Sequence, residues 1–167
     1  MKYINHYTSV MGHMLFAADE MGLTGVWFEN QKYYASTLSP THQEKDLPVF
    51  EQTKHWLDIY FSGQEPDFLP PIHMVGSPFQ IAVWKILQNI PYGKTTTYGE
   101  IAQILAKQKG LFQMSAQAVG GAVGHNKIAI LIPCHRVIGK NGNLTGYAGG
   151  IEKKTQLLKL EKTNIFS

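Results

Sequence analysis

Three prolines, Pro66, Pro70 and Pro71, interrupt this chain between an acidic half and a basic half. Because proline fixes φ and lacks a backbone N–H, the stretch is typical of a stiff connection. Residues 1–75 hold four lysines against nine acidic residues, whereas residues 76–167 hold ten lysines and one arginine against three. We therefore expect two domains with these bounds, the second facing a polyanion, although a basic surface without nucleic acid is the alternative.

The overall composition is that of an ordinary globular protein, with 44% hydrophobic and 16% charged residues. The sequence contains no run of about eighteen apolar residues, so we expect no membrane-spanning helix. The segment Met1–Val10 lacks the basic-then-apolar pattern of a secretion signal. We accordingly expect a cytoplasmic protein with no membrane partner.

The acidic half predicts strands followed by a helix. Apolar runs at His13–Asp19 and Leu23–Phe28, separated by a short turn, predict a β-hairpin. Pro48–Tyr60 has apolar residues at helical spacing and is followed by Ser62-Gly63, which favours a helix that stops there.

The basic half predicts a series of short helices. Ser77 before Pro78 is a typical helix start, and apolar residues follow at helical spacing as far as Ile90. Thr97 and Glu100 predict a capping box for a second helix that Gly110 closes. Ser115 predicts the cap of a third, Ala116–Val123, which is built of small residues. Two short helices joined by a turn in a basic region suggest helix-turn-helix, although close helix packing would also explain the small residues.

Two further elements are expected near the end of the chain. The continuous apolar run Ile128–Ile132 has strand length and predicts a strand buried on both faces. Ile151–Lys162 predicts a final helix, with an acid in its first turn and lysines near its end.

Cys134 is the only cysteine, which rules out an internal disulfide and a cysteine-rich zinc site. It is either a small buried hydrophobe or a nucleophile. Neighbouring His135 could accept the thiol proton in a turn or through a water, and a carboxylate from Glu100, Glu152 or Glu161 could orient it. Arg136, the only arginine, could pair with a buried carboxylate, brace the loop, or bind DNA phosphate.

The segment Ile132-Pro133-Cys134-His135-Arg136-Val137 resembles the signature of the O6-alkylguanine-DNA alkyltransferases, also called methylated-DNA–protein-cysteine methyltransferases. The resemblance covers nearly the whole basic half, and the acidic half is similar only in outline. It includes Phe79…Val83-Trp84, Ile90-Pro91-Tyr92-Gly93, Thr97-Tyr98-Gly99-Glu100-Ile101-Ala102, Ala118-Val119-Gly120-Gly121-Ala122, Asn126 and Gly146-Tyr147-Ala148-Gly149-Gly150.

This resemblance implies an α/β N-terminal ribonuclease-H-like domain followed by a mostly helical helix-turn-helix catalytic domain. It implies a monomer that binds double-stranded DNA containing O6-alkylguanine through the minor groove and flips the damaged base out. The alkyl group would pass irreversibly to the protein, one lesion per molecule, without a cofactor. Some relatives carry zinc in the first domain; with a single cysteine, we expect no metal here.

The resemblance also assigns roles to individual residues. Cys134 would attack the alkyl carbon, His135 would take its proton through a water, and Glu161 would orient His135. Tyr98 would protonate the leaving guanine, and Asn126 would hold the turn after the recognition helix. The remaining residues would bind the base (the Cys134 and Val137 carbonyls, Tyr147 and Ala148 within the loop Leu144–Gly149) or the DNA (Gly99, Ala116, Gln117, Ala118, Gly121 and Lys140).

The chain departs from the family pattern in two places. Gln117 stands where the family usually has the arginine that fills the gap left by the flipped base. We therefore expect weaker DNA binding, or compensation by Lys107, Lys109 or Lys127. The segment Lys107–Met114 is also longer than the usual turn. Two alternatives remain: a lesion sensor that binds without reacting, and a Cys-His-Glu hydrolase of a small substrate.

Overall fold

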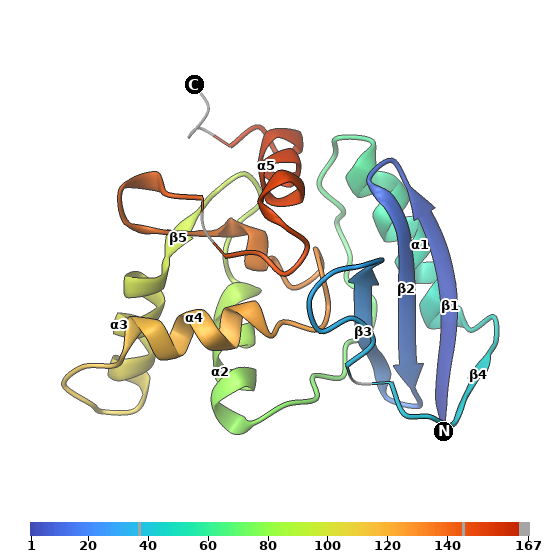
Figure 1. The fold of residues 1–167 in the computed structure, drawn as a ribbon, viewed down its shortest axis with the longest axis horizontal. Coiled ribbons are helices and arrows are strands. Elements are labelled where there is room, and N and C mark those ends of the chain that lie inside the picture. Colours follow the sequence, from blue (N-terminus) through green and yellow to red (C-terminus); the bar gives the residue numbers. More distant parts are fainter. Residues whose placement is uncertain (37, 145, 164–167) are drawn as a thin grey trace. The chain divides into compact units, whose positions relative to one another are not determined.

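The computed structural model describes residues 1–36, 38–144 and 146–163. The chain packs as two compact units (Figure 1). The first comprises Met1–Val75 with Lys127–Leu131, and the second comprises Gly76–Asn126 with Ile132–Ser167. The division expected from the sequence placed residues 127–131 in the second domain, whereas in the structure they pack with the first unit.

The first unit is built on a four-stranded sheet with the order β3-β2-β1-β4. The strands are β1 (Lys2–Ser9), β2 (Gly12–Asp19), β3 (Gly22–Phe28) and β4 (His42–Glu44). The predicted hairpin is confirmed as the antiparallel pair β2–β3, in which Phe16 lies opposite Val26. Sequence patterns missed β1 and β4, because β1 is rich in polar residues and β4 is exposed throughout. Neither strand has the apolar alternation that predicts a half-buried strand.

The helix α1 (Pro48–Phe61) packs against one face of this sheet (Figure 1). Pro48 opens the helix at a position where its missing N–H costs no hydrogen bond. Phe50 is buried and its ring stacks on Phe16 of β2, with the centroids 6.2 Å apart. The predicted helix is confirmed, and its apolar side closes the core of the first unit.

The run Ile128–Ile132 is buried as expected, but the prediction of a strand is wrong. Only Ile128 forms a β-bridge, opposite Val26 of β3. The Val26 N–H donates to the Lys127 carbonyl at 2.9 Å, and the Ala129 N–H donates to the Val26 carbonyl at 2.9 Å. Ile130 then adopts a φ of 69°, which ends the extended backbone. Burial alone selects apolar residues, so a short apolar run does not reveal the backbone conformation.

The described residues of the second unit form four α-helices and a short two-stranded sheet (Figure 1). The elements are α2 (Pro78–Leu87), β5 (Thr96–Thr97), α3 (Tyr98–Gln108), α4 (Ala116–Gly124), the 3₁₀ turns η1 (Cys134–Arg136) and η2 (Lys140–Gly142), β6 (Val137–Ile138) and α5 (Ile151–Leu160). Strands β5 and β6 pair in parallel. All four predicted helices are present, although α2 ends at Leu87 rather than Ile90.

Side-chain caps begin three of these helices. Ser77 and Gln80 form a full capping box on α2, and Ser115 accepts from the Ala118 N–H on α4. Thr97 accepts from the Glu100 N–H as expected, but the Glu100 carboxylate accepts instead from the Thr96 hydroxyl at 2.6 Å. The predicted box at α3 is therefore only half confirmed.

Helices α2, α3 and α4 pack around a shared core. Trp84 of α2 is buried, and its indole N–H donates to the Ala122 carbonyl of α4 at 2.9 Å. Val119, Ala122 and Val123 form the buried side of α4. The other side of α4 is consequently available to a ligand.

Two absences hold for the described residues. None of their helices is both long and apolar enough to cross a membrane. They also contain no cluster of three or more histidine, cysteine or acidic side chains that could hold a metal ion.

Candidate active site and DNA-binding face

Cys134 lies at the start of the 3₁₀ turn η1, directly after Pro133. The Arg136 N–H donates to the Pro133 carbonyl at 3.0 Å, and the Val137 N–H donates to the Cys134 carbonyl. Because the chain turns here, the side-chain alternation of a strand does not apply to Cys134 and His135. The turn suggested by Pro133 is therefore present.

The Cys134 thiol is almost fully buried, with 6% of the residue exposed. Burial raises the pKa of the thiol to about 11, although a hydrogen bond with the Asn126 side chain and the charge of Lys154 oppose this increase. The thiol is consequently protonated at neutral pH. A nucleophilic role requires a base that removes its proton during the reaction.

His135 is fully buried and lies beside Glu161, with Nε2 2.6 Å from Oε2 of the carboxylate. Burial lowers the pKa of His135, and the nearby charges of Arg136 and Lys154 lower it further, against the opposing effect of Glu161. The imidazole is therefore neutral near pH 7. Since an ionised carboxylate only accepts, Nε2 carries the proton and Nδ1 has the lone pair of a base.

Arg136 binds the same carboxylate from another direction. Its Nε donates to Glu161 Oε1 at 2.8 Å, one terminal nitrogen donates to Oε2 at 3.1 Å, and the other donates to the Ile90 carbonyl at 2.7 Å. The Gly93 N–H also donates to Oε1 at 3.1 Å. Burial opposes ionisation of Glu161, but His135 and Arg136 outweigh it and hold the pKa of the carboxyl well below its usual range. Of the roles considered for Arg136, the structure contains the buried ion pair.

Asn126 connects the end of α4 to the cysteine turn. It is buried, and its Nδ2 donates to the Ile132 carbonyl at 2.8 Å. Its side chain also hydrogen-bonds with Cys134, which favours the thiolate. A single amide thus positions both the backbone before Cys134 and the sulfur itself.

Lys154 is a residue that our sequence analysis did not select. It lies on α5, is fully buried, and donates from Nζ to the Val137 carbonyl at 2.5 Å. Burial lowers the pKa of Lys154 to about 8, against the opposing effect of Cys134. The sequence spacing could have revealed this burial, because Lys154 lies on the same apolar face of α5 as Leu157 and Leu158.

Both tyrosines of the predicted base pocket, Tyr98 and Tyr147, interact electrostatically with Cys134. Burial, followed by the electrostatic interaction with Cys134 when its thiol is ionised, raises the pKa of Tyr98, whose hydroxyl lies 3.5 Å from the Gly146 carbonyl. Burial, followed by Cys134 and Glu161, raises the pKa of Tyr147 well above its usual value. Ala148 is half-buried beside it, whereas Thr145 of the same loop lies outside the described residues.

The six residues expected to contact DNA are all exposed: Gly99, Ala116, Gln117, Ala118, Gly121 and Lys140. Gly99, Ala116 and Lys140 line one pocket of about 500 Å³, together with Tyr98. Gln117, Ala118 and Gly121 lie outside this pocket on the exposed side of α4. The sequence from Ile101 to Ile151 contains no acidic residue, which suits a surface that binds a polyanion.

Comparison with known families covers almost the whole chain. The sequence model of the 6-O-methylguanine DNA methyltransferase ribonuclease-like domain matches residues 2–73, and that of the DNA-binding domain matches residues 78–163. The chain belongs to this methyltransferase family. The expected fold class, a ribonuclease-like α/β domain followed by a mostly helical DNA-binding domain, is confirmed.

Individual members of the methyltransferase family are similar over most of their length. The methylated-DNA–protein-cysteine methyltransferase of Haemophilus influenzae is 40% identical over 96% of this chain and 86% of its own length. That of Mycobacterium bovis is 42% identical, over 95% and 93%. The crystal structure of Mycobacterium tuberculosis OGT in complex with DNA is 42% identical, covers 96% of this chain and 92% of its own, and has a TM-score of 0.81.

Proposed function

We propose that this protein repairs DNA by transferring the alkyl group of O6-alkylguanine, mainly O6-methylguanine, irreversibly and stoichiometrically to Cys134. It would thus be a single-turnover methylated-DNA–[protein]-cysteine S-methyltransferase. The proposal rests mainly on one observation in this member of the family. Cys134, His135 and Glu161 are all buried, His135 directly follows Cys134, and His135 lies within hydrogen-bond distance of Glu161. A buried thiol beside a neutral, oriented imidazole has the chemistry of a nucleophile with its base.

The transfer begins with the thiol proton, which moves to Nδ1 of His135 through a bridging water. The sulfur attacks the alkyl carbon, an S–C bond forms, and the C–O6 bond breaks with its electrons passing into the guanine ring. Tyr98 donates its hydroxyl proton to N3 of the leaving base and recovers a proton from solvent, while His135 releases one. Atoms and charge balance, and the products are guanine and a thioether.

Base recognition uses the groups around the thiol. The Val137 and Cys134 carbonyls accept from the exocyclic amine, the Ala148 N–H donates to O6, and Tyr147 walls the pocket. Lys154 already donates to the Val137 carbonyl, whose second lone pair is the one that would accept from the base. Nothing in this arrangement removes an alkyl group from sulfur, so one protein molecule repairs one lesion.

DNA binding places the exposed side of α4 in the minor groove, as part of a helix-turn-helix formed with α3. The small side chains Ala116, Ala118 and Gly121 suit this narrow groove. The lesion then flips out of the stack, and Gln117 occupies the space that it leaves. The protein would act as a monomer in the cytoplasm.

The test is to mix the protein with a duplex that carries one O6-methylguanine, then record the intact protein mass and map the modified peptide. We expect a gain of one methyl group on Cys134 that saturates at one per protein. A Cys134→Ser variant should bind the same duplex and gain nothing. Binding without any gain by the wild-type protein would support a lesion sensor instead, and turnover of a small substrate without DNA would support a hydrolase.

A further inference from the structure

The loop between α3 and α4 exposes apolar side chains that the transfer reaction does not use. After Lys109 the chain reverses at Gly110, where φ is 66°, and the Leu111 N–H donates back to the Ala106 carbonyl at 2.8 Å. The reversal leaves Leu111 half exposed and the Phe112 ring fully exposed. Two adjacent large apolar side chains are therefore available on the surface for a contact with another molecule.

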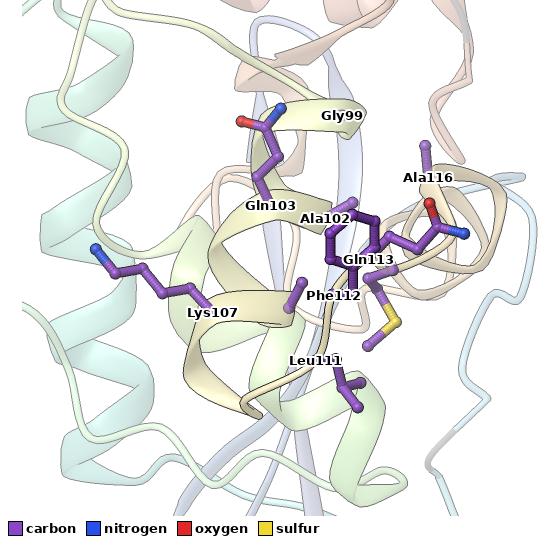
Figure 2. A pocket seen from close by; sticks show the side chains of 10 residues that line it. Gly99, Ala102, Gln103, Lys107, Leu111, Phe112, Gln113 and Ala116 are labelled. Atoms are coloured by element: carbon purple, nitrogen blue, oxygen red, sulfur yellow. The ribbon is translucent and has the colours of Figure 1, made fainter.

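This loop borders a pocket of about 600 Å³ that runs alongside α3 (Figure 2). Gly99 and Ala116 lie at one end of the pocket, and Leu111 lies at the other (Figure 2). The same two small residues also line the pocket beside Tyr98 and Lys140. The surface around Phe112 is therefore continuous with the face that the proposed function assigns to DNA.

The charge around the loop identifies the kind of partner. Lys107 lines the pocket, and Lys109 lies over the Phe79 ring with its Nζ 5.6 Å from the centroid. The sequence has no acidic residue between Glu100 and Glu152. Lysines beside an exposed apolar side chain fit a duplex, whose minor groove has apolar sugar walls between two lines of phosphates.

We infer that the α3–α4 loop is a second DNA contact, with Phe112 packed as an apolar wedge in the minor groove beside the lesion and Lys107 close to a phosphate. The inference rests on the proposed function, which places α4 in that groove. Many proteins that bind the minor groove insert large apolar side chains between base steps. The contact would compensate for Gln117, which is uncharged where the family usually has arginine.

The test measures the dissociation constant for an undamaged labelled duplex by fluorescence anisotropy across a series of salt concentrations. Phe112→Ala should weaken binding by at least about fivefold, because losing one aromatic contact with a base has an effect of that size. Its salt dependence should not change, since no charge is lost. Lys107→Met should instead reduce the slope of log K against log salt by about one.

A matched pair of leucines controls for the loss of exposed apolar surface. Leu111 and Leu69 are each 50% exposed, and Leu69 lies in the other unit. Leu111→Ala should weaken DNA binding and Leu69→Ala should not. Phe112→Trp should retain affinity, and its indole emission should be quenched by the duplex. All five variants should melt at the wild-type temperature, because the replaced side chains are exposed.

Several results would overturn the inference. These are a Phe112→Ala affinity within twofold of wild type, an equal loss in the Leu69 control, or a wild-type protein that does not bind DNA. So would sedimentation showing that Phe112 holds two copies together without DNA. The binding assay uses an undamaged duplex and therefore does not depend on methyl transfer. A failure of methyl transfer would contradict the proposed reaction, but the affinities of the Phe112 variants could still be interpreted.

Discussion

Glu161 Oε2 lies 2.6 Å from His135 Nε2, although the two residues are 26 positions apart in the chain. His135 follows the cysteine directly in the η1 turn, and Glu161 is the C-cap of α5. The position of the base thus depends on how the end of α5 packs against the cysteine turn. Arg136 donates two hydrogen bonds to the same carboxylate, so Glu161 both pairs with Arg136 and positions His135.

Glu161→Gln should affect stability and reaction together. The change leaves the buried Arg136 cation without its counter-charge, so we expect the free energy of unfolding to fall by about 3–5 kcal/mol. The rate of methyl transfer should fall at least about a hundredfold, because His135 loses the partner that fixes its tautomer. Urea unfolding and single-turnover kinetics measure the two effects.

Exposed Glu152, in the first turn of the same helix, is the control, and Glu152→Gln should keep the wild-type transfer rate and lose no more than about 1 kcal/mol of stability. Folding lowers the pKa of Glu161, so its contribution to stability is complete above the ordinary value of 4.5 and is lost as the pH falls below it. The stability difference between wild type and Glu161→Gln should therefore shrink in acid. A difference that is the same at pH 3 and pH 7 would contradict the ion-pair explanation.

The pH dependence of methyl transfer should report His135. The residue acts as a base only when neutral, and folding lowers its pKa below 6.5. We expect a rate that is constant between about pH 6.5 and 8 and that falls only in more acidic solution. Single-turnover rates on the methylated duplex measure the profile. A rate that rises tenfold for each unit across this range would mean that the thiolate forms without His135.

Lys154→Met should slow the reaction without unfolding the protein. Folding lowers the pKa of Lys154 from 10.5 to about 8, so burying its charge costs as much as about 3 kcal/mol below pH 8. Methionine removes this cost together with the hydrogen bond to Val137, so stability at pH 7 should be equal or higher. The methyl-transfer rate should nevertheless fall about tenfold, since the Val137 carbonyl and the Cys134 thiol lose a nearby cation.

The stability difference in this comparison should also depend on pH. Between pH 8 and 10.5 the unfolded lysine binds the proton more strongly than the folded one does, so wild-type stability rises relative to Lys154→Met. Urea unfolding at pH 7, 9 and 10 measures this trend. Lys159→Met, at an exposed position of the same helix, is the control for the loss of one lysine.

Gln117→Arg should increase affinity for lesion DNA. Gln117 is exposed on α4 among the residues assigned to the minor groove, and arginine adds a cation and a longer reach. We expect about a tenfold tighter complex at moderate salt. Gln156→Arg adds the same charge at an exposed position of α5 and measures the general effect of charge. Equal gains in the two variants would show that position 117 has no special role.

Local sequence signals succeeded where one segment determines its own conformation. Ser77 and Ser115 cap helices in the structure, as their side chains predicted. The hairpin of β2 and β3 was also visible, because both strands are largely buried and apolar. The strand β1 was not, since its pairing comes from its neighbours rather than from its own composition.

The sequence was enough to nominate the nucleophile, its base and three possible carboxylates, and the family resemblance selected Glu161 among them. Residue type determines this chemistry, because a thiol becomes a strong nucleophile once a neighbouring imidazole accepts its proton. The choice of Glu161 by geometry, the pairing of Arg136 and the burial of Lys154 depended on the tertiary structure. Contacts between residues far apart in the chain form only when α5 packs beside the cysteine turn, and no local pattern records that packing.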